Sequence, residues 1–294
     1  MTERLGPRLF INGKPAESNH VPLPFEREEL SVFESLRSYG GVIFRLDQHL
    51  DRLFESAKSA GLEVPKTREE LRKEVYLALR HSGRKDAFLR LWLDSHDRYI
   101  LVLERTRPAW IYEKGVSLKT AATRRNLINA APPEVKAGEF LNNILAFLEQ
   151  AEPETFESIF LDADGFVTEA LVWNLFIVKS GKIFTAASGV LNGVTRRFVI
   201  ECAQKERLPV FELNLTRHDL WNAEEAFLTN TSGEIVPIRT LDGRRIGSKI
   251  PGHITLKLMS RFQKDLQKEL RDSRPPLQQK KASPSRIQSV SAYK

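Results

Sequence analysis

Apolar and polar residues alternate in several short stretches of the first hundred residues, and this period of two predicts β-strands. The first stretches are 9–14 (LFINGK) and 31–39 (SVFESLRSY), and the glycine pair that follows turns the second one back into VIFRL as a hairpin. Residues 88–105 (FLRLWLDSHDRYILVLER) predict another hairpin, which turns between Asp94 and Arg98. The N-terminal part therefore contains at least two hairpins.

Two segments between these hairpins have the 3.6-residue spacing of amphipathic helices. They are 46–61 (LDQHLDRLFESAKSAG), which ends at a glycine, and 67–83 (TREELRKEVYLALRHSG). Thr67 and Glu70 have the spacing of a capping box, in which each side chain accepts a bond from the other residue's backbone N–H. The second helix is therefore expected to begin at Thr67.

The second part of the chain mixes short strands with two or three helices, and its last helix is 253–272 (HITLKLMSRFQKDLQKELRD). Residues 107–115 are irregular, and we interpret them as a domain connection. The regular strand-helix-strand rhythm of a doubly wound sheet is missing, which favours an α+β fold. We expect an N-terminal domain in 1–107, a connection in 108–115, a C-terminal domain in 116–270 and a tail in 271–294.

The charge of the chain is concentrated at its C-terminal end. The 294 residues carry a net charge of +7, but residues 271–294 hold six basic residues and one acidic residue, so the remainder is nearly neutral. The tail is rich in Ser, Pro, Gln and Lys, which predicts a solvated and disordered segment. The alternative is a basic contact with nucleic acid or an anionic membrane, but no specific nucleic-acid partner is expected.

Cysteine and histidine usage excludes two kinds of site. The single cysteine, Cys202, rules out an intramolecular disulfide framework and is expected to be a packed thiol within a helix. The six histidines lack ligand spacing, so no metal site is predicted. The start has no apolar core of signal-peptide length, and no apolar stretch is long enough to span a bilayer, so we expect a cytoplasmic protein without a membrane partner.

One lysine and one glutamate stand where polar turns meet apolar segments. Lys136 lies in PPEVKAGEFLNNILAFLEQ, where a proline-bounded loop leads into an apolar helix. An amine held out of water has a lower pKa and becomes a nucleophile toward an aldehyde. Glu169 follows a predicted turn at Asp164 and Gly165 and precedes apolar residues, so its carboxylate needs a cationic partner such as a protonated pyridine nitrogen.

Two further segments have the features of anion sites. In SGVLNGVTRRFVIECAQKE, Gly193 permits a tight turn, and an amphipathic helix is predicted over 194–205. Its first backbone N–H groups, the helix dipole and the Thr195 hydroxyl can all face a phosphate. In AFLTNTSGEIVPI, Thr231 and Ser232 lie between two extended segments, and their hydroxyl groups form a second candidate site for a phosphate.

At these residues the chain resembles the class IV aminotransferases, the fold type IV pyridoxal-phosphate enzymes. That family includes branched-chain and D-amino acid aminotransferases and aminodeoxychorismate lyase. The resemblance runs from Leu9 to Phe262 and rests on motifs that occur in the family's order: FESLRSYGG, LDQHLDRLFESA, the Lys136 segment, VTEALVWNLF, LNGVTRR and AEEAFLTNTSGEIVPI. It implies two α/β domains with pyridoxal 5'-phosphate in the cleft between them, and a homodimer.

The resemblance also implies a role for each matching residue. Lys136 looks like the residue that bonds to the cofactor, and Glu169 like the one that keeps the pyridine nitrogen protonated. Arg52 looks like the phosphate-binding arginine and lies on the same helix face as His49. The implied cofactor site consists of Arg52, Lys136, Glu169, Val194, Thr195 and Thr231. The implied substrate site consists of Arg90, at a position that binds a carboxylate in several members, with Phe33, Phe88 and Ser232.

Some positions depart from the family's pattern. Phe33 stands where some members have tyrosine, Phe140 where many have tyrosine or leucine, and Glu139 where asparagine is frequent. Hydroxyl partners for the cofactor's phenolate are therefore missing at these positions. Ala170, Leu171, Val172 and Trp173 replace small residues, which predicts a bulkier and more apolar wall.

We expect an aminotransferase that passes the amino group of an amino acid to a 2-oxo acid. Phe33, Phe88, Phe140 and Trp173 favour branched-chain or other apolar substrates. Two alternatives stay open at this point. One is aminodeoxychorismate lyase, which releases pyruvate during 4-aminobenzoate synthesis, and the more distant one is a protein that binds the cofactor without turnover.

Overall fold

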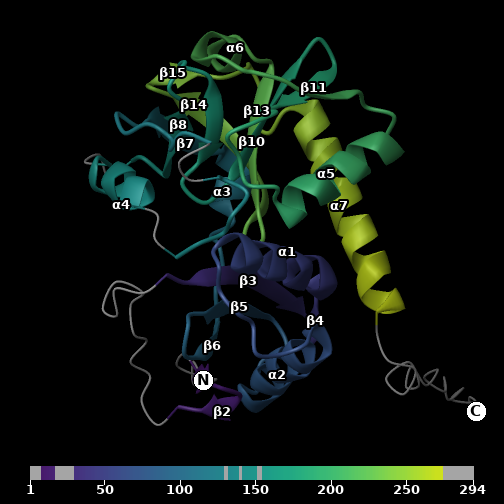
Figure 1. The fold of residues 1–294 in the computed structure, drawn as a ribbon. Helices are drawn as coiled ribbons and strands as arrows, with labels where there is room; N and C mark the ends of the chain where they lie inside the picture. The colour runs from purple at the N-terminus through teal and green to yellow at the C-terminus, as the bar shows by residue number, and fades with distance from the viewer. Residues whose placement is uncertain (1–7, 17–29, 129–131, 139–140, 151–153, 274–294) are drawn as a thin grey trace, which may run out of the picture.

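The computed structural model describes residues 8–16, 30–128, 132–138, 141–150 and 154–273 (Figure 1). The N-terminal half contains one antiparallel sheet with the strand order β2-β1-β6-β5-β3-β4. Its strands are β1 (Arg8–Ile11), β2 (Lys14–Pro15), β3 (Val32–Tyr39), β4 (Val42–Ile43), β5 (Ala87–Leu93) and β6 (Arg98–Leu103).

Helices α1 (Leu46–Ser59) and α2 (Arg68–His81) pack on one face of this sheet. The predicted capping box of α2 is confirmed, because Thr67 and Glu70 each accept from the other's backbone N–H. Both predicted hairpins, β3 with β4 and β5 with β6, are also confirmed.

Alternation along β3 and β5 sends neighbouring side chains to opposite faces of the sheet. Val32, Leu36 and Leu89 belong to the core formed with α1 and α2. The intervening Phe33 and Arg90 instead line a large cavity between the two halves of the molecule. The same alternation that builds the core therefore places the candidate substrate residues on the other side.

The C-terminal half is built around a nine-stranded mixed sheet with the order β12-β11-β10-β13-β14-β7-β8-β9, and β15 pairs with β14. The pairs β11–β12, β14–β7 and β7–β8 are parallel. The strands are β7 (Val116–Thr120), β8 (Glu157–Leu161), β9 (Val167–Ala170), β10 (Asn174–Lys179), β11 (Lys182–Thr185), β12 (Val210–Glu212), β13 (Glu225–Asn230), β14 (Glu234–Leu241) and β15 (Arg244–Arg245).

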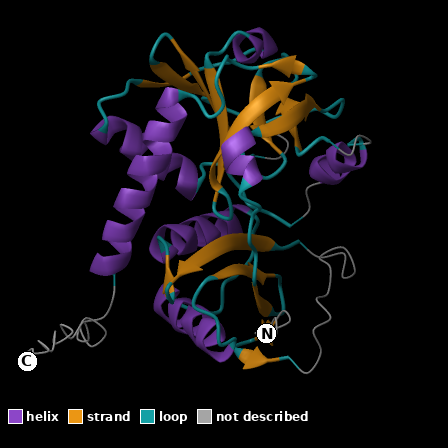
Figure 2. Cartoon of the chain, turned by 180° about the vertical axis from the view of Figure 1, so that it is seen from behind, coloured by secondary structure: helices purple, strands orange, loops and turns teal. Residues whose placement is uncertain are grey.

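Two helices, α5 (Val194–Lys205) and α7 (His253–Asp272), pack against one face of this sheet and form a core with β10 and β13. Val42 and Phe44 from the N-terminal half belong to the same core. Helix α7 continues past the large sheet and reaches down beside the smaller half (Figure 2). The remaining helices are α3 (Trp110–Lys114), α4 (Leu141–Leu148) and α6 (Arg217–Trp221).

Two sheets with helices on their faces make the fold α+β, as predicted. One expectation is corrected, because the segment read as irregular contains the short helix α3. The last helix includes Arg271 and Asp272, and residues 274–294 of the predicted tail lie outside the described residues. Cys202 is a packed thiol, since it is fully buried in α5 and burial raises its pKa to about 12. Within the described part of the chain, no helix combines the length and apolar character needed to cross a membrane.

Candidate functional site

One cavity of about 940 Å³ lies between the two halves, and both halves contribute to its wall. The predicted apolar wall is present, because Leu171, Val172 and Trp173 line the cavity. Every residue of the implied cofactor and substrate sites also lines it: Phe33, Arg52, Phe88, Arg90, Lys136, Glu169, Val194, Thr195, Thr231 and Ser232.

The backbone of Lys136 is held by the N-terminal half. Phe33 N donates to the Lys136 carbonyl at 3.0 Å, and Gly138 N donates to the Ser31 carbonyl at 2.6 Å. The Lys136 N–H donates to Ser56 Oγ of α1 at 3.0 Å. These bonds dock the loop before α4 on β3 and α1, so the lysine enters the cavity from a fixed position.

The Lys136 side chain points to the ring of Phe33, with Nζ 4.2 Å from the ring centroid. Enclosure by protein lowers the pKa of the amine, and the nearby Arg52 lowers it further, to about 7. Glu34 and Glu169 act in the opposite direction but are outweighed. The amine is therefore available in its neutral, nucleophilic form near neutral pH.

Glu34, which was not predicted from the sequence, holds Arg52 in place. Its carboxylate is fully buried and accepts two bonds from Arg52, at 2.7 and 2.8 Å. His49 Nδ1 lies 2.7 Å from the same carboxylate. Burial alone would raise the pKa of Glu34, but Arg52 and His49 outweigh it and lower the pKa to about 2. The predicted common face of His49 and Arg52 is thus fixed by a carboxylate from β3.

Arg52 also reaches the loop before α5, where its Nη1 donates to the Asn192 carbonyl at 2.9 Å. Helix α5 starts there with Gly193 as N-cap, and no side chain caps it. Gly193, Val194 and Thr195 all line the cavity. The first backbone N–H groups of a helix without a side-chain cap, together with a nearby guanidinium, make a site for an anion.

Gly193 is needed for a different reason from the one predicted. Its φ of −64° is open to any residue, so the tight turn does not require glycine. A Cβ at this position would come within 2.2 Å of Asn174 Oδ1, however. The glycine therefore allows the start of α5 to approach the Asn174 side chain closely.

Thr231 and Ser232 belong to the turn between β13 and β14. Asn230 Oδ1 accepts from the backbone N–H groups of Ser232 at 3.0 Å and of Gly233 at 2.7 Å, which fixes the turn. Thr229, just before the turn, has a buried hydroxyl without a hydrogen-bond partner in the described residues. A buried hydroxyl that lines a cavity and lacks a partner is a ready contact for a polar ligand.

Glu169 is buried and held in place by three donors. Arg125 Nη2 donates to it at 2.7 Å, Asn174 Nδ2 at 2.9 Å and the Leu191 N–H at 3.0 Å. Burial raises its pKa, although Arg125 opposes the rise. Arg125 is therefore the cationic partner within the chain, which the sequence reading did not identify. A second cation in the cavity would stabilise the carboxylate further.

Three more arginines line the cavity, and two of them, Arg105 and Arg107, were not predicted from the sequence. Arg90 Cζ lies 4.1 Å from the Phe33 ring centroid, and Arg105 Cζ lies 4.9 Å from that of Phe88. Arg107 donates to Ser232 Oγ at 3.4 Å. Among the described residues none of these arginines forms an ion pair with a carboxylate. Arg90 also lacks the cross-strand acid that a purely structural role would require, because Ser35 and Leu101 are its neighbours in the sheet.

The site defines a class of protein before any comparison. A lysine amine with a lowered pKa faces the cavity, Arg52 and the start of α5 can bind an anion there, and the buried Glu169 carboxylate lines the same cavity. These groups fit a phosphorylated aromatic aldehyde with a basic ring nitrogen, which is pyridoxal 5'-phosphate. Two of the positions predicted to supply no hydroxyl group to the cofactor's phenolate, Glu139 and Phe140, lie outside the described residues.

The comparisons with known proteins agree with this class. The family model for amino-transferase class IV matches residues 31–241. A branched-chain-amino-acid aminotransferase of Pseudomonas aeruginosa is 31% identical over 254 residues, which cover 79% of this chain and 83% of that protein. A D-alanine aminotransferase of Bacillus licheniformis is 28% identical over 89% of this chain and 98% of its own length. This chain belongs to the class IV aminotransferase family, and it is a pyridoxal-phosphate-dependent aminotransferase.

The solved structures point the same way. The T.th. branched-chain amino acid aminotransferase with pyridoxamine 5'-phosphate matches with a TM-score of 0.81 at 28% identity, covering 90% of this chain and 94% of that chain. The same T.th. enzyme has been solved with N-(5'-phosphopyridoxyl)-L-glutamate and with 4-methylvaleric acid. The fold is therefore that of the fold type IV aminotransferases, as the resemblance implied.

We predict that capture of pyridoxal 5'-phosphate by the apoprotein follows the titration of Lys136. Only a neutral amine attacks an aldehyde, and the lowered pKa of about 7 means that the neutral fraction falls as the pH drops below that value. The capture rate, followed by the absorbance of the cofactor, should rise about 10-fold between about pH 6 and pH 8 and then level off.

Pyridoxal serves as the control, because it lacks the phosphate, whose own titration would otherwise contribute. It should give the same profile at a lower rate. A rate that continues to rise toward about pH 10 would show that Lys136 titrates like an exposed lysine, contrary to the lowered pKa described above.

Proposed function

We propose that the enzyme transfers the amino group of an apolar, branched-chain type amino acid to a 2-oxo acid in the cavity beside Lys136. The observation that carries this proposal is the mixed wall of the cavity. Arg90, Arg105 and Arg107 supply positive charge and form no ion pair with a carboxylate in the described residues. Glu157 lines the same cavity and interacts electrostatically with Arg105 and Arg107, but burial raises its pKa to about 7, so it offsets their charge only in part. Most of the remaining wall is apolar. The apolar lining consists of Phe33, Phe88, Trp92, Leu101, Ile144, Phe147, Phe156, Leu171, Val172 and Trp173. Such a wall suits a small acid with a hydrocarbon side chain.

Arg90 and Lys136 are close enough to act on one small molecule. Their cationic groups both lie near the ring of Phe33, so Arg90 Cζ and Lys136 Nζ are at most about 8 Å apart. An α-amino acid carries its amine and its carboxylate on the same carbon. Arg90 is therefore proposed to bind the substrate carboxylate while the amine is presented to the cofactor beside Lys136.

The cofactor supplies the electron sink for the reaction, and the residues of the chain hold and orient it. Arg52, Val194, Thr195 and Thr231 are proposed to bind its phosphate. Glu169 is proposed to accept from its ring nitrogen and so to keep that nitrogen protonated. Lys136, once its amine is free and neutral, moves a proton at the substrate Cα, a role worth roughly 10²- to 10⁴-fold in rate.

Arg105 and Arg107 are proposed to help bind the amino acceptor. A monocarboxylic acid needs one arginine, and Arg90 can supply it. Two more arginines, stacked on Phe88 and Trp173, leave positive charge for a second carboxylate. An acidic 2-oxo acid such as 2-oxoglutarate would use it, and an apolar substrate would place its side chain on the aromatic wall instead.

The proposed substrate class predicts which compounds convert the bound cofactor to its amine form. L-Leucine and L-glutamate should both bleach the yellow absorbance band in single-turnover experiments, because each offers a carboxylate to Arg90 and suits one part of the wall. Arg107→Met should weaken the reaction of glutamate about 10-fold more than that of leucine, since only glutamate has a second carboxylate to lose a charged partner.

Other donor compounds and the same variant give the outcomes that would contradict the proposal. Bleaching by D-alanine alone would show that the enzyme acts on D-amino acids rather than L-amino acids. Release of pyruvate from aminodeoxychorismate without bleaching would show that it is the related lyase. If Arg107→Met slows the reactions of leucine and glutamate by the same factor, the proposed acceptor site is excluded. Absence of turnover with every donor, in protein that carries the cofactor, would favour a binding protein.

We further propose that the enzyme is a homodimer joined through α4. Leu141, Phe147 and Leu148 expose 63%, 65% and 70% of their surface, which is unusual for large apolar residues in one short helix. Asn142 and Asn143 bond this helix to the carbonyls of Arg124 and Leu171. Val172, next to Leu171 in the chain, and Leu127 and Ile128, shortly after Arg124, are also exposed.

A second copy of the chain is the proposed partner because Ile144, Phe147 and Val172 are exposed and also line the cavity. Covering them would close one side of the cavity and exclude water from it. The double variant Leu141→Glu/Leu148→Glu, which leaves the cavity wall unchanged, should sediment as a monomer and lose activity. Leu256→Glu, at an exposed leucine on α7, is the control and should stay dimeric. A monomeric parent protein, or a dimeric double variant, would refute the interface.

A further inference from the structure

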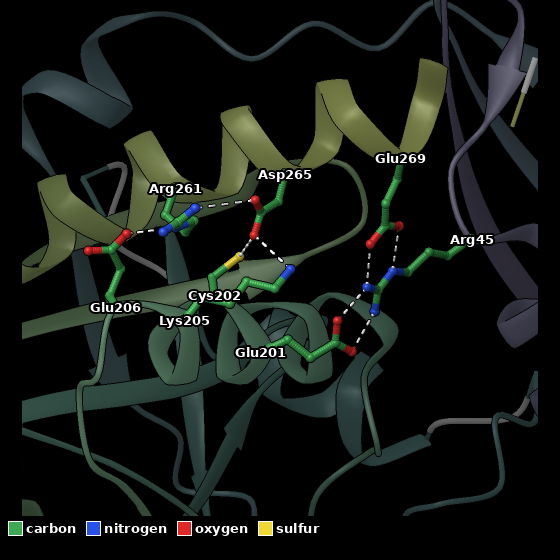
Figure 3. A network of polar contacts seen from close by, with 8 residues as sticks. All are labelled: Arg45, Glu201, Cys202, Lys205, Glu206, Arg261, Asp265 and Glu269. Atoms are coloured by element: carbon green, nitrogen blue, oxygen red, sulfur yellow. Dashed lines mark hydrogen bonds and ion pairs between the residues drawn. The ribbon is translucent and has the colours of Figure 1, made fainter. Parts of the chain in front are cut away.

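Arg45 joins the two halves of the molecule through two carboxylates at once (Figure 3). It immediately precedes α1, and its side chain is only 8% exposed. Its guanidinium donates to Glu201 of α5 at 2.8 and 2.5 Å, and to Glu269 of α7 at 3.0 and 2.7 Å. Both pairs are bidentate, so they restrict orientation as well as distance.

The surroundings of Arg45 keep this arrangement charged and rigid. Its Cζ lies 4.3 Å from the ring centroid of Phe198 and 5.5 Å from that of Phe44. Burial alone would lower the pKa of Arg45, but Glu201 and Glu269 outweigh it and raise the pKa. The hydrogen bonds from Arg45 are in turn the main reason why the pKa of Glu201 is lowered. Arg45 and Glu201 are therefore ionised under ordinary conditions.

The contact with Glu201 lies two helical turns away from the proposed phosphate site along both helices. Arg52 is seven residues after Arg45 on α1, and Glu201 is seven residues after Val194 on α5. Seven residues of α-helix span about 10.5 Å. At the other end, Arg52 Nη1 donates to the Asn192 carbonyl at 2.9 Å. Helices α1 and α5 are thus tied together at two points, one at the cavity and one remote from it.

We propose that Arg45 is a positioning residue for the cofactor phosphate. By tying α1 to α5 at the remote point, it prevents the two helices from sliding or pivoting and so fixes the spacing between Arg52 and the start of α5. A phosphate that is bound by both helices requires that spacing. This inference rests on the proposed phosphate site.

The remaining contacts in Figure 3 have a different effect. Lys205 of α5 pairs with Asp265 of α7 at 2.9 Å, and Arg261 of α7 pairs with Glu206 at 2.6 Å. These pairs lie within the C-terminal half and do not involve α1. They hold α5 on α7, whereas only Arg45 connects this helix pair to α1 in the network drawn.

The test measures the affinity of the apoprotein for pyridoxal 5'-phosphate and for pyridoxal, which lacks the phosphate. Arg45→Met keeps an apolar side chain beside Phe198 and removes the charge. It should weaken the affinity for pyridoxal 5'-phosphate about 10-fold and change the affinity for pyridoxal less than about 2-fold. Arg45→Lys should recover part of the loss. A variant that loses affinity equally for both compounds, or for neither, overturns the proposal.

Two acid variants separate the two arms of the contact and cover the case in which Arg45→Met fails to fold. Glu201→Gln loosens the tie between α1 and α5 and should show the same phosphate-selective loss. Glu269→Gln leaves that tie in place and should have the smaller effect. The reverse order would show that α7, rather than the spacing of α1 and α5, controls phosphate binding, and would overturn the proposal.

Two more variants serve as references. Arg98→Met removes a comparably buried bidentate pair, Arg98 with Glu74, that lies wholly within the N-terminal half, and it should leave both affinities unchanged. If Arg98→Met loses affinity for pyridoxal 5'-phosphate as selectively and as strongly as Arg45→Met does, the positioning role of Arg45 is overturned. Arg52→Ala should itself lose affinity selectively for the phosphate compound. If it does not, the phosphate site is wrongly assigned, whereas a normal Arg45→Met beside a defective Arg52→Ala refutes only the positioning role.

Discussion

The cavity depends on hydrogen bonds that hold the Lys136 segment against the N-terminal half of the molecule. The Lys136 carbonyl accepts from Phe33 N, its N–H donates to Ser56 Oγ, and Gly138 N donates to Ser31 O. These partners are far apart in the chain, so the loop takes its position only when β3 and α1 have formed and docked. The environment that lowers the pKa of Lys136 is therefore a product of domain packing, and neither sheet creates it alone.

Charges are organised differently at the two sides of the cavity. On the side proposed for the cofactor, Glu34 holds Arg52, and Arg125 with two other donors holds Glu169, so these side chains are positioned before any ligand arrives. On the other side, Arg90 has no carboxylate partner among the described residues. Paired charges give a preorganised site for a constant cofactor, and unpaired charges leave room for substrates that exchange during each cycle. This division agrees with the double-substrate chemistry of an aminotransferase.

Local patterns in the sequence predict the elements, and long-range pairing determines the rest. Hydrophobic periodicity and the Thr67 capping box identify α1, α2 and the hairpins of the smaller sheet, because these features depend on neighbours in the chain. The predicted site residues line one cavity because the loops before α4 and α5 and the turn after β13 converge there, and because Arg52 and Arg90 face it from within α1 and β5. Glu34 and Arg125 could not be found in this way. Glu34 resembles any strand acid until α1 packs over it, and Arg125 meets Glu169 only across 44 residues of chain.

The central claim is that Lys136, with its lowered pKa, forms the covalent bond to pyridoxal 5'-phosphate. Borohydride reduction of the holoenzyme, followed by proteolysis and mass spectrometry, tests it most directly. The account predicts that the phosphopyridoxyl group is found on the peptide containing Lys136, and that Lys136→Ala yields no labelled peptide although the protein folds. A label on another lysine, such as Lys179 or Lys182, or undiminished labelling of Lys136→Ala, would contradict it.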